Sequence, residues 1–263
     1  MNITDIEYIT LRIARKYFFS PRILSSWARW IPYYRSPCGQ DNPGAIVERY
    51  LGLLRKEGLG ITGKTLLEIG IGRTNATAYG LIAAGAKICY GYEPYARLDQ
   101  ALDQKSGAEF SSNSTLRQHV VRISSLTEVE SGSIDLILSH SVLEHVEQRV
   151  QLFSELKRII KNGGEMIHIV DYRDHFFKYP FHFYKFSQAA WQRINPGLTR
   201  LRVNDHLRLL GECGFRVEVI ERKLAIEAWR QFKDRNTPSV EFSGYSDEDL
   251  ATEEAVISAK KID

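Results

Sequence analysis

The feature that most constrains the fold is the alternation of short apolar runs with amphipathic stretches along the middle of the chain. Apolar runs of strand length occur at 64–70, 87–93, 118–124, 134–140 and 165–171. Stretches with helical spacing of apolar residues lie before and between them, at 45–57, 75–84, 95–105 and 146–161. Strands that alternate with helices are typical of a mostly parallel sheet with helices on both faces. The sequence therefore predicts an α/β fold.

The pattern continues toward the C-terminus. A helix is predicted at 203–213, and strands at 214–223 and 253–261 bring the expected sheet to seven strands. Asn162-Gly163-Gly164 is expected to end the helix at 146–161, because glycine and asparagine are common just after a helix. Residues 45–263 are interpreted as one domain built on this sheet.

Two segments fall outside the alternation. Residues 1–44 are predicted to form an N-terminal helical extension, which could pack on the domain, cover its site as a lid, or lie on an anionic membrane face. Residues 172–200 are crowded with aromatic and basic side chains and are interpreted as an insertion on the acceptor side of the site. These aromatic residues could line an acceptor pocket or pack in a core of their own.

Composition excludes several classes of protein. The net charge of +3 over 263 residues gives no overall field typical of a nucleic-acid binder. The three widely spaced cysteines suggest neither a disulfide framework nor a zinc cluster. No signal peptide or transmembrane run is recognisable, so we expect a cytoplasmic protein, with peripheral contact at the inner membrane face as one role of the N-terminal helix. The acidic stretch 241–254 is expected to be solvated surface.

A glycine-rich turn follows the first predicted strand. It reads Gly70-Ile71-Gly72, and Glu93 ends the second predicted strand 21 residues beyond Gly72. Such a turn lets a ligand approach the backbone and directs the next helix N-terminus at it, while a carboxylate at the second strand end can accept both hydroxyls of a ribose. The two elements predict an adenosine-containing ligand at the carboxyl edge of the sheet.

Two side chains near the turn distinguish between adenosine ligands. A dinucleotide-binding turn needs a third glycine, and Asn75 occupies that position. Glu68 places a negative charge beside the turn, which suits the ammonium and sulfonium groups of S-adenosylmethionine and would repel a pyrophosphate. The residues favour S-adenosylmethionine over a dinucleotide.

With these motifs the sequence resembles the class I S-adenosylmethionine-dependent methyltransferases, in particular their type-11-like small-molecule group. Glu68-Ile69-Gly70-Ile71-Gly72-Arg73-Thr74 resembles the first family motif, with Thr74 in place of its last glycine. Further resemblances are Ile134–His140 to the fourth motif, Leu143-Glu144-His145-Val146 to the turn after it, and Ile160–Gly164 to the turn before the fifth strand. The resemblance implies a Rossmann-like fold and S-adenosyl-L-methionine as the cofactor.

The same resemblance implies a set of cofactor-binding residues. Ser125 and Leu126 stand where the family often has an acidic residue near the adenine, and His140 is expected beside the methionine part of the cofactor. The full expected set is Glu68, Gly70, Ile71, Gly72, Thr74, Glu93, Ser125, Leu126, Ser139 and His140.

Several chemistries are disfavoured by the residues at the ends of the predicted strands. Ser139-His140-Ser141 is neither the Asn/Asp-Pro-Pro-aromatic motif of adenine-N6 or cytosine-N4 methylation nor the Pro-Cys nucleophile of cytosine-C5 methylation. The resemblance to metal-dependent catechol-type enzymes fails because only Asp171 is available among the acidic ligands they place after two strands. We therefore expect no metal and no nucleic-acid partner.

Three residues are candidates for catalysis. Methyl transfer depends mainly on positioning, but a hydroxyl acceptor benefits from a base near neutral pH, which histidine provides. His145 and His175 follow the fourth and fifth predicted strands, and Asp171 could orient a base. The alternatives are that His145 hydrogen-bonds to backbone at a helix start, that His175 is an ordinary loop residue, and that Asp171 caps a turn.

These observations favour metal-independent transfer of a methyl group to an oxygen or nitrogen of a small molecule, a glycan or a lipid-linked intermediate. One alternative is a catalytically inactive relative that serves as a binding or scaffold protein, suggested by Thr74 and Ser125. The other is a nucleotide-dependent oxidoreductase, which Asn75 and Glu68 argue against.

Overall fold

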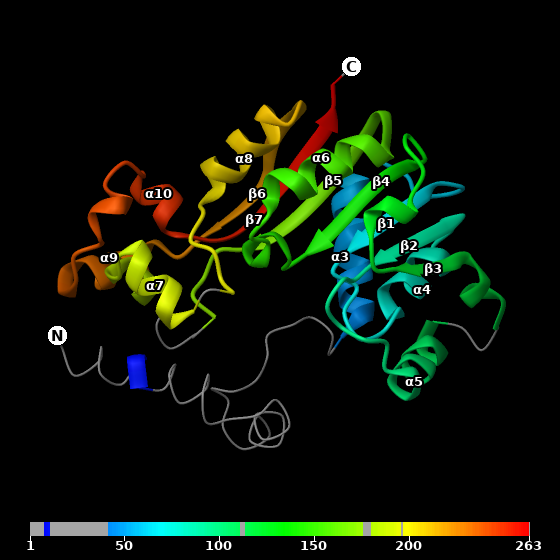
Figure 1. Cartoon of the computed structure of the whole chain (residues 1–263), viewed down its shortest axis with the longest axis horizontal. Helices are drawn as coiled ribbons and strands as arrows, with labels where there is room; N and C mark the ends of the chain where they lie inside the picture. The colour runs from blue at the N-terminus through cyan, green and yellow to red at the C-terminus, as the bar shows by residue number, and fades with distance from the viewer. Residues whose placement is uncertain (1–7, 11–41, 111–113, 176–179, 196, 263) are drawn as a thin grey trace.

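The computed structural model describes residues 8–10, 42–110, 114–175, 180–195 and 197–262. Within these ranges one seven-stranded sheet has the order β3-β2-β1-β4-β5-β7-β6 (Figure 1). Neighbouring strands from β3 to β5 are parallel, and β7 lies antiparallel between β5 and β6. The strands are β1 Thr65–Ile69, β2 Ile88–Tyr92, β3 Val120–Ile123, β4 Ile134–His140, β5 Ile160–Asp171, β6 Phe215–Leu224 and β7 Thr252–Lys261. The predicted seven-stranded, mostly parallel, Rossmann-like sheet is confirmed.

Helices cover both faces of the sheet, as predicted. Those named in Figure 1 are α3 Pro43–Lys56, α4 Ala76–Ala83, α5 Gln100–Phe110, α6 Arg149–Ile159, α7 Gln188–Ile194, α8 Val203–Glu212, α9 Ile226–Arg235 and α10 Asp247–Leu250. Consecutive strand residues alternate between two cores: Leu67 faces the core shared with α6 and α8, while Leu66 faces the core shared with α3 and α4. This period of two buries both faces of the sheet and fixes its register.

A third core lies beyond the end of the sheet and contains the described aromatic residues of the predicted insertion. Phe181, Phe183, Tyr184 and Trp191 are each at most 2% exposed and pack against residues of α9 and α10. Their cluster also includes Trp229 and Phe232, whose rings meet those of Phe181 and Tyr184 edge-on. These aromatic side chains therefore build their own core, which is the packing alternative considered for the segment; residues 176–179 lie outside the described ranges.

Two predicted helix boundaries are wrong. The helix expected at 146–161 is α6, and Ile160 already has the extended backbone of β5. Ile134 pairs with Ile160 while Leu136 pairs with Glu165, so Asn162-Gly163-Gly164 forms a bulge inside the strand and does not end the helix. The helix expected at 95–105 begins only at Gln100, because the Glu93 side chain accepts hydrogen bonds from the N–H groups of Tyr95 and Ala96 and holds that segment as a loop.

The acidic stretch near the C-terminus is only partly solvated. Asp249 is fully buried, and Asp247 accepts hydrogen bonds from Trp229 and Lys233. The predicted N-terminal extension lies outside the described residues except for 8–10 and its last residues, where α3 begins at Pro43. Tyr8 is fully buried and its hydroxyl donates to Asp174. None of the helices in the described ranges combines the length and apolarity needed to cross a bilayer.

Arg202 joins the third core to the sheet. Its side chain is 1% exposed, and its guanidinium donates to the carbonyl oxygens of Tyr172, Asp249 and Thr252 at 2.7–3.2 Å. It also lies over the rings of Tyr172 and Tyr184. One planar fork thus satisfies three carbonyls from two segments of the chain.

We expect Arg202→Lys to lower the free energy of unfolding by about 3 kcal/mol or more, since a lysine cannot reach three carbonyls and each unpaired buried group costs about 1–3 kcal/mol. Urea unfolding followed by circular dichroism measures the change. Arg208→Lys is the matched control, because Arg208 is a residue on α8 with an exposed side chain that pairs with Glu212. Equal stability of the two variants would contradict the bridging role.

Candidate functional site

Two adjacent cavities open at the carboxyl ends of β1, β2, β4 and β5. A cleft of about 870 Å³ runs from Glu93 to the start of α6. A smaller cavity of about 120 Å³ lies between α3, Glu68 and the end of β5. Gly70, Ser141 and His145 line both of them. The position agrees with the general rule that ligands of open α/β sheets bind outside the carboxyl ends of the strands.

The glycine turn shapes the wall between the cavities. Gly70 and Gly72 have φ angles of 77° and 72°, in the left-handed region that favours glycine. A Cβ atom on Gly70 would lie 2.4 Å from Cγ2 of Val142, so this position also needs glycine for space. Among the described residues Ser141 is the single non-glycine residue with positive φ. Thr74 therefore fits the turn with an ordinary backbone.

Glu93 and Arg122 hold the turn from two sides. One carboxylate oxygen of Glu93 accepts the Gly72 N–H at 3.0 Å. The guanidinium of Arg122 donates to the carbonyls of Gly72 and Ala96. Glu93 lines the larger cleft together with Ser125 and Leu126, the residues that the sequence analysis expected to face a nucleoside.

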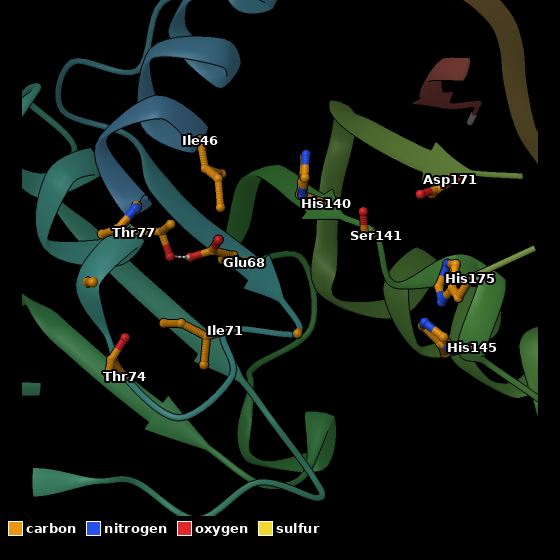
Figure 2. Close-up of a pocket in the computed structure, with 13 residues that line it drawn as sticks. Ile46, Glu68, Ile71, Thr74, Thr77, His140, Ser141, His145, Asp171 and His175 are labelled. Carbon is orange, nitrogen blue, oxygen red and sulfur yellow. Dashed lines mark hydrogen bonds between the residues drawn. The ribbon is translucent and has the colours of Figure 1, made fainter. Parts of the chain in front are cut away.

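Glu68 is a buried carboxyl group in the wall of the smaller cavity. It is 4% exposed, and its one side-chain hydrogen bond among the described residues comes from the Thr77 hydroxyl at 2.5 Å (Figure 2). Burial raises the pKa of Glu68 to about 7, against a smaller opposing effect of the Thr77 hydrogen bond. No lysine or arginine of the described ranges forms an ion pair with it. A cationic group in this cavity would favour its ionised form.

Three of the remaining cofactor candidates line the smaller cavity, and the fourth, Ser139, lines neither cavity. Ile71, Thr74 and His140 line the smaller cavity (Figure 2). Burial lowers the pKa of His140, with the charges of Glu254 and Asp171 opposing, so its ring is neutral near pH 7. The expectation that Ser139 contacts the cofactor is corrected. Ser139 is fully buried, its Oγ lies 2.7 Å from Nδ1 of His168, and it lines neither cavity. Alternation along β4 directs His140 to the cavity and Ser139 to the opposite face, where it meets His168 of β5.

The catalytic candidates converge at the other end of the smaller cavity. Figure 2 shows the rings of His145 and His175 side by side, with their centroids 4.9 Å apart. Nδ1 of His145 lies 2.7 Å from the carbonyl oxygen of Gly197, so this nitrogen carries the proton and donates it. The backbone hydrogen bond considered as the alternative for His145 is therefore present, and the ring still lines both cavities.

Asp171 lines the same cavity, but its carboxylate is engaged. It accepts the backbone N–H of Arg173 at 2.9 Å and two hydrogen bonds from the Arg173 guanidinium. This geometry agrees with the turn-cap alternative. Tyr172 points away, into a hydrogen bond with His206.

Three lining or neighbouring residues were not singled out from the sequence. Thr77 and Ser141 line the smaller cavity, and Glu144 lies beside His145 and His175. Thr77 lies nine residues after Glu68, on the first turn of α4. A polar residue near the start of the helix after the glycine turn is a local pattern, so Thr77 could have been predicted from the sequence as a lining residue. The approach of Glu144 to His175 depends on two loops meeting, and no local pattern reveals it.

A family model matches the central part of the chain. Residues 67–168 match the family model described as a methyltransferase domain. They include the last three residues of β1, all of β2, β3, β4 and α6, and most of β5. No curated protein matches the chain by sequence.

Solved structures share the fold at low identity. Phosphoethanolamine N-methyltransferase 2 of Haemonchus contortus, in complex with S-adenosyl-L-methionine, has a TM-score of 0.57 and 15% identity, covering 95% of this chain and 59% of that one. The same enzyme with phosphomonomethylethanolamine and S-adenosylhomocysteine has a TM-score of 0.56, 14% identity, and covers 94% and 58%. Geranyl diphosphate C-methyltransferase of Streptomyces coelicolor A3(2), in complex with Mg²⁺, geranyl diphosphate and S-adenosyl-L-homocysteine, has a TM-score of 0.53 and 16% identity, covering 82% and 79%.

The chain thus spans somewhat under two thirds of the length of the first of these enzymes, and the likeness is one of fold. The family model covers the part of the sheet that carries the glycine turn, Glu93, and the loop after β4. Residues 67–168 thus match a methyltransferase domain, and the chain shares the fold of solved S-adenosylmethionine-dependent methyltransferases.

Proposed function

We propose that this protein transfers a methyl group from S-adenosyl-L-methionine to an oxygen or nitrogen of a small molecule, a glycan or a lipid-linked intermediate. The observation that carries the proposal is that the two cavities lie side by side and share Gly70, Ser141 and His145 as lining residues. A ligand held at Glu93 and Glu68 would have its reactive centre between these residues and the histidines. Positioning of two reactants in one enclosed space is the main requirement of such a transfer.

The residues of the larger cleft and of the glycine turn fit the cofactor. Glu93 can accept ribose hydroxyls with the lone pairs that the backbone amides leave, and Ser125 and Leu126 lie where an adenine would contact the wall. Glu68, buried without a basic partner among the described residues, suits the ammonium of the methionine part. When bound, S-adenosyl-L-methionine supplies a methyl carbon on a sulfonium, which is already an activated leaving group.

Two imidazoles on the acceptor side of the site could take a proton from the acceptor. Because Nδ1 of His145 donates to Gly197, its Nε2 carries the lone pair and can accept a proton from an acceptor hydroxyl or ammonium. His175 is the second candidate base, and Asp171, paired with Arg173, fixes the start of the loop that bears His175. Asp171 is therefore proposed to position the loop and not to take the proton.

A small-molecule acceptor is supported by the neighbours that share the fold. Their solved complexes hold phosphomonomethylethanolamine in one case and geranyl diphosphate in another. The described aromatic residues of the 172–200 segment lie mainly in the third core, so the acceptor pocket draws its walls from α3 and the loops after β4 and β5. This cavity, at about 120 Å³, suits a compact reacting group.

The cofactor site is tested by calorimetric titration of the protein with S-adenosylhomocysteine. We expect binding by the wild type and a loss of about tenfold to 100-fold in affinity for Glu93→Ala, since hydrogen bonds to a charged group contribute about 1.5–3 kcal/mol each and the turn loses its support at Gly72. Glu109→Ala, an exposed carboxylate on α5, is the control and should bind as the wild type does. Absence of binding by the wild type would leave the scaffold alternative.

The raised pKa of Glu68 predicts a pH dependence of that affinity. With a pKa of about 7, roughly a tenth of the carboxyl is ionised at pH 6 and nine tenths at pH 8. Because only the ionised form attracts the ligand's ammonium, the affinity for S-adenosylhomocysteine should rise by up to about tenfold over this range.

Glu68→Gln should remove the rise, because its amide does not titrate, and should bind weakly throughout. Glu109→Gln is the matched control and should keep the wild-type profile. The same pH profile for the wild type and Glu68→Gln would show that Glu68 does not face the ammonium.

A further inference from the structure

Three potential metal ligands meet at the acceptor end of the smaller cavity. Glu144 and His145 are neighbours in the 3₁₀ turn Leu143–His145 after β4, and His175 comes from the loop after β5. One ligand atom from each of the three lies within 4.8 Å of the other two. A tetrahedral ion at about 2 Å from its ligands needs the ligand atoms about 3.3 Å apart, so small rotations of these side chains would bring the three atoms together around one ion.

The surroundings of Glu144 are a second observation in favour of a metal site, independent of the distances among the three ligands. Its side chain is 2% exposed, yet within the described ranges neither carboxylate oxygen has a hydrogen-bond partner. The nearby arginine, Arg173, forms its ion pair with Asp171. A buried carboxylate without a partner is costly, and native proteins nearly always pair such a group with a donor, a cation or a metal. The backbone amides of Glu144 and Asp171 and the charge of Arg173 offset the cost of its burial only in part, because the pKa of Glu144 stays raised. The two imidazoles beside Glu144 would complete a metal site.

His145 is oriented as a metal ligand would be. Its Nδ1–H donates to the Gly197 carbonyl at 2.7 Å, which fixes the tautomer with the lone pair on Nε2. The backbone N–H of Thr199 in turn donates to the Glu144 carbonyl at 2.8 Å, so Gly197 and Thr199 hold both neighbours in place. In histidine–metal sites, the ring nitrogen that does not bind the metal usually donates its proton to a backbone carbonyl, a carboxylate or water.

We propose that Glu144, His145 and His175 bind a divalent transition-metal ion of the Zn²⁺ type. Two imidazoles and one carboxylate favour Zn²⁺ over Mg²⁺ or Ca²⁺, which prefer oxygen ligands throughout. Three protein ligands leave one position of a tetrahedral site open, and His145 and His175 line the cavity toward which it would point. The expectation from the sequence of no metal considered only Asp171, since the meeting of these two loops cannot be read from the sequence.

The open position gives the ion a role at the acceptor, a consequence that rests on the proposed function. With the lone pairs of His145 and His175 bound to the ion, the ion replaces these histidines as the group that promotes loss of the acceptor's proton. A bound divalent ion lowers the pKa of an oxygen ligand by several units, so an acceptor held through a hydroxyl would lose its proton more easily near neutral pH. The acceptor class that fits is therefore a molecule with a hydroxyl or another anionic oxygen near the methylated atom.

The test is the metal content of the full chain, without an affinity tag, after chelator treatment and equilibrium dialysis against Zn²⁺. The wild type should bind one ion per chain. Glu144→Gln and His175→Ala should each weaken binding by about 100-fold or more, because loss of an outer-shell partner alone costs about 10-fold to 100-fold. His119→Ala, an exposed histidine before β3, is the matched control and should bind as the wild type does.

Titration of the same variants with S-adenosylhomocysteine separates the two proposals. Loss of Zn²⁺ binding with S-adenosylhomocysteine binding retained supports the metal site and shows that the variant is folded. His175→Ala decides the matter if Glu144→Gln fails to fold, since His175 lies in a loop. No Zn²⁺ bound by the wild type, or equal binding by all variants, overturns the metal site. A wild type that binds Zn²⁺ and no S-adenosylhomocysteine overturns the proposed function alone.

Discussion

The site depends on the left-handed turn between β1 and α4. Gly70 and Gly72 adopt backbone angles that other residues avoid, and Val142 from the loop after β4 fills the space where a side chain on Gly70 would stand. Glu93 and Arg122 then hold the Gly72 peptide from both sides. The turn therefore ties neighbouring parallel strands together at their carboxyl ends, and both cavities open around it. Replacement of Gly70 would disturb the backbone, the packing of Val142 and the ligand wall at once.

Two buried carboxyl groups determine the electrostatics of the smaller cavity. Glu68 lies at one end, with one side-chain hydrogen bond from Thr77 among the described residues, and Glu144 lies beside the other end, where neither of its carboxylate oxygens has a hydrogen-bond partner in the described ranges. Burial raises the pKa of both, for Glu68 to about 7. Such groups lower the stability of the empty protein, so cations supplied from outside the chain are the natural explanation. The ammonium of the proposed cofactor fits the first, and a metal ion fits the second.

The sheet could be predicted from the sequence because its strands are continuous apolar runs: the strand predicted at 134–140 is β4 as observed. The helix α9 was missed because its buried residues, Trp229 and Phe232, gain their burial from aromatic residues some fifty positions earlier. The glycine turn and Glu93 could be predicted because their spacing is local. The role of Glu144 could not, since its surroundings depend on how the loops after β4 and β5 meet. Ser139 was misplaced by one step of strand alternation, which directs it to His168.

The central claim is that the cofactor lies along the two adjacent cavities, between Glu93 and Glu68, with its reactive end toward His145. A crystal structure of the complex with S-adenosylhomocysteine tests it most directly. The account predicts ribose hydroxyls within hydrogen-bond distance of Glu93, the amino group near Glu68, and the sulfur facing the space beside Ser141 and His145. A ligand bound elsewhere, or bound with its amino group away from Glu68, would contradict it.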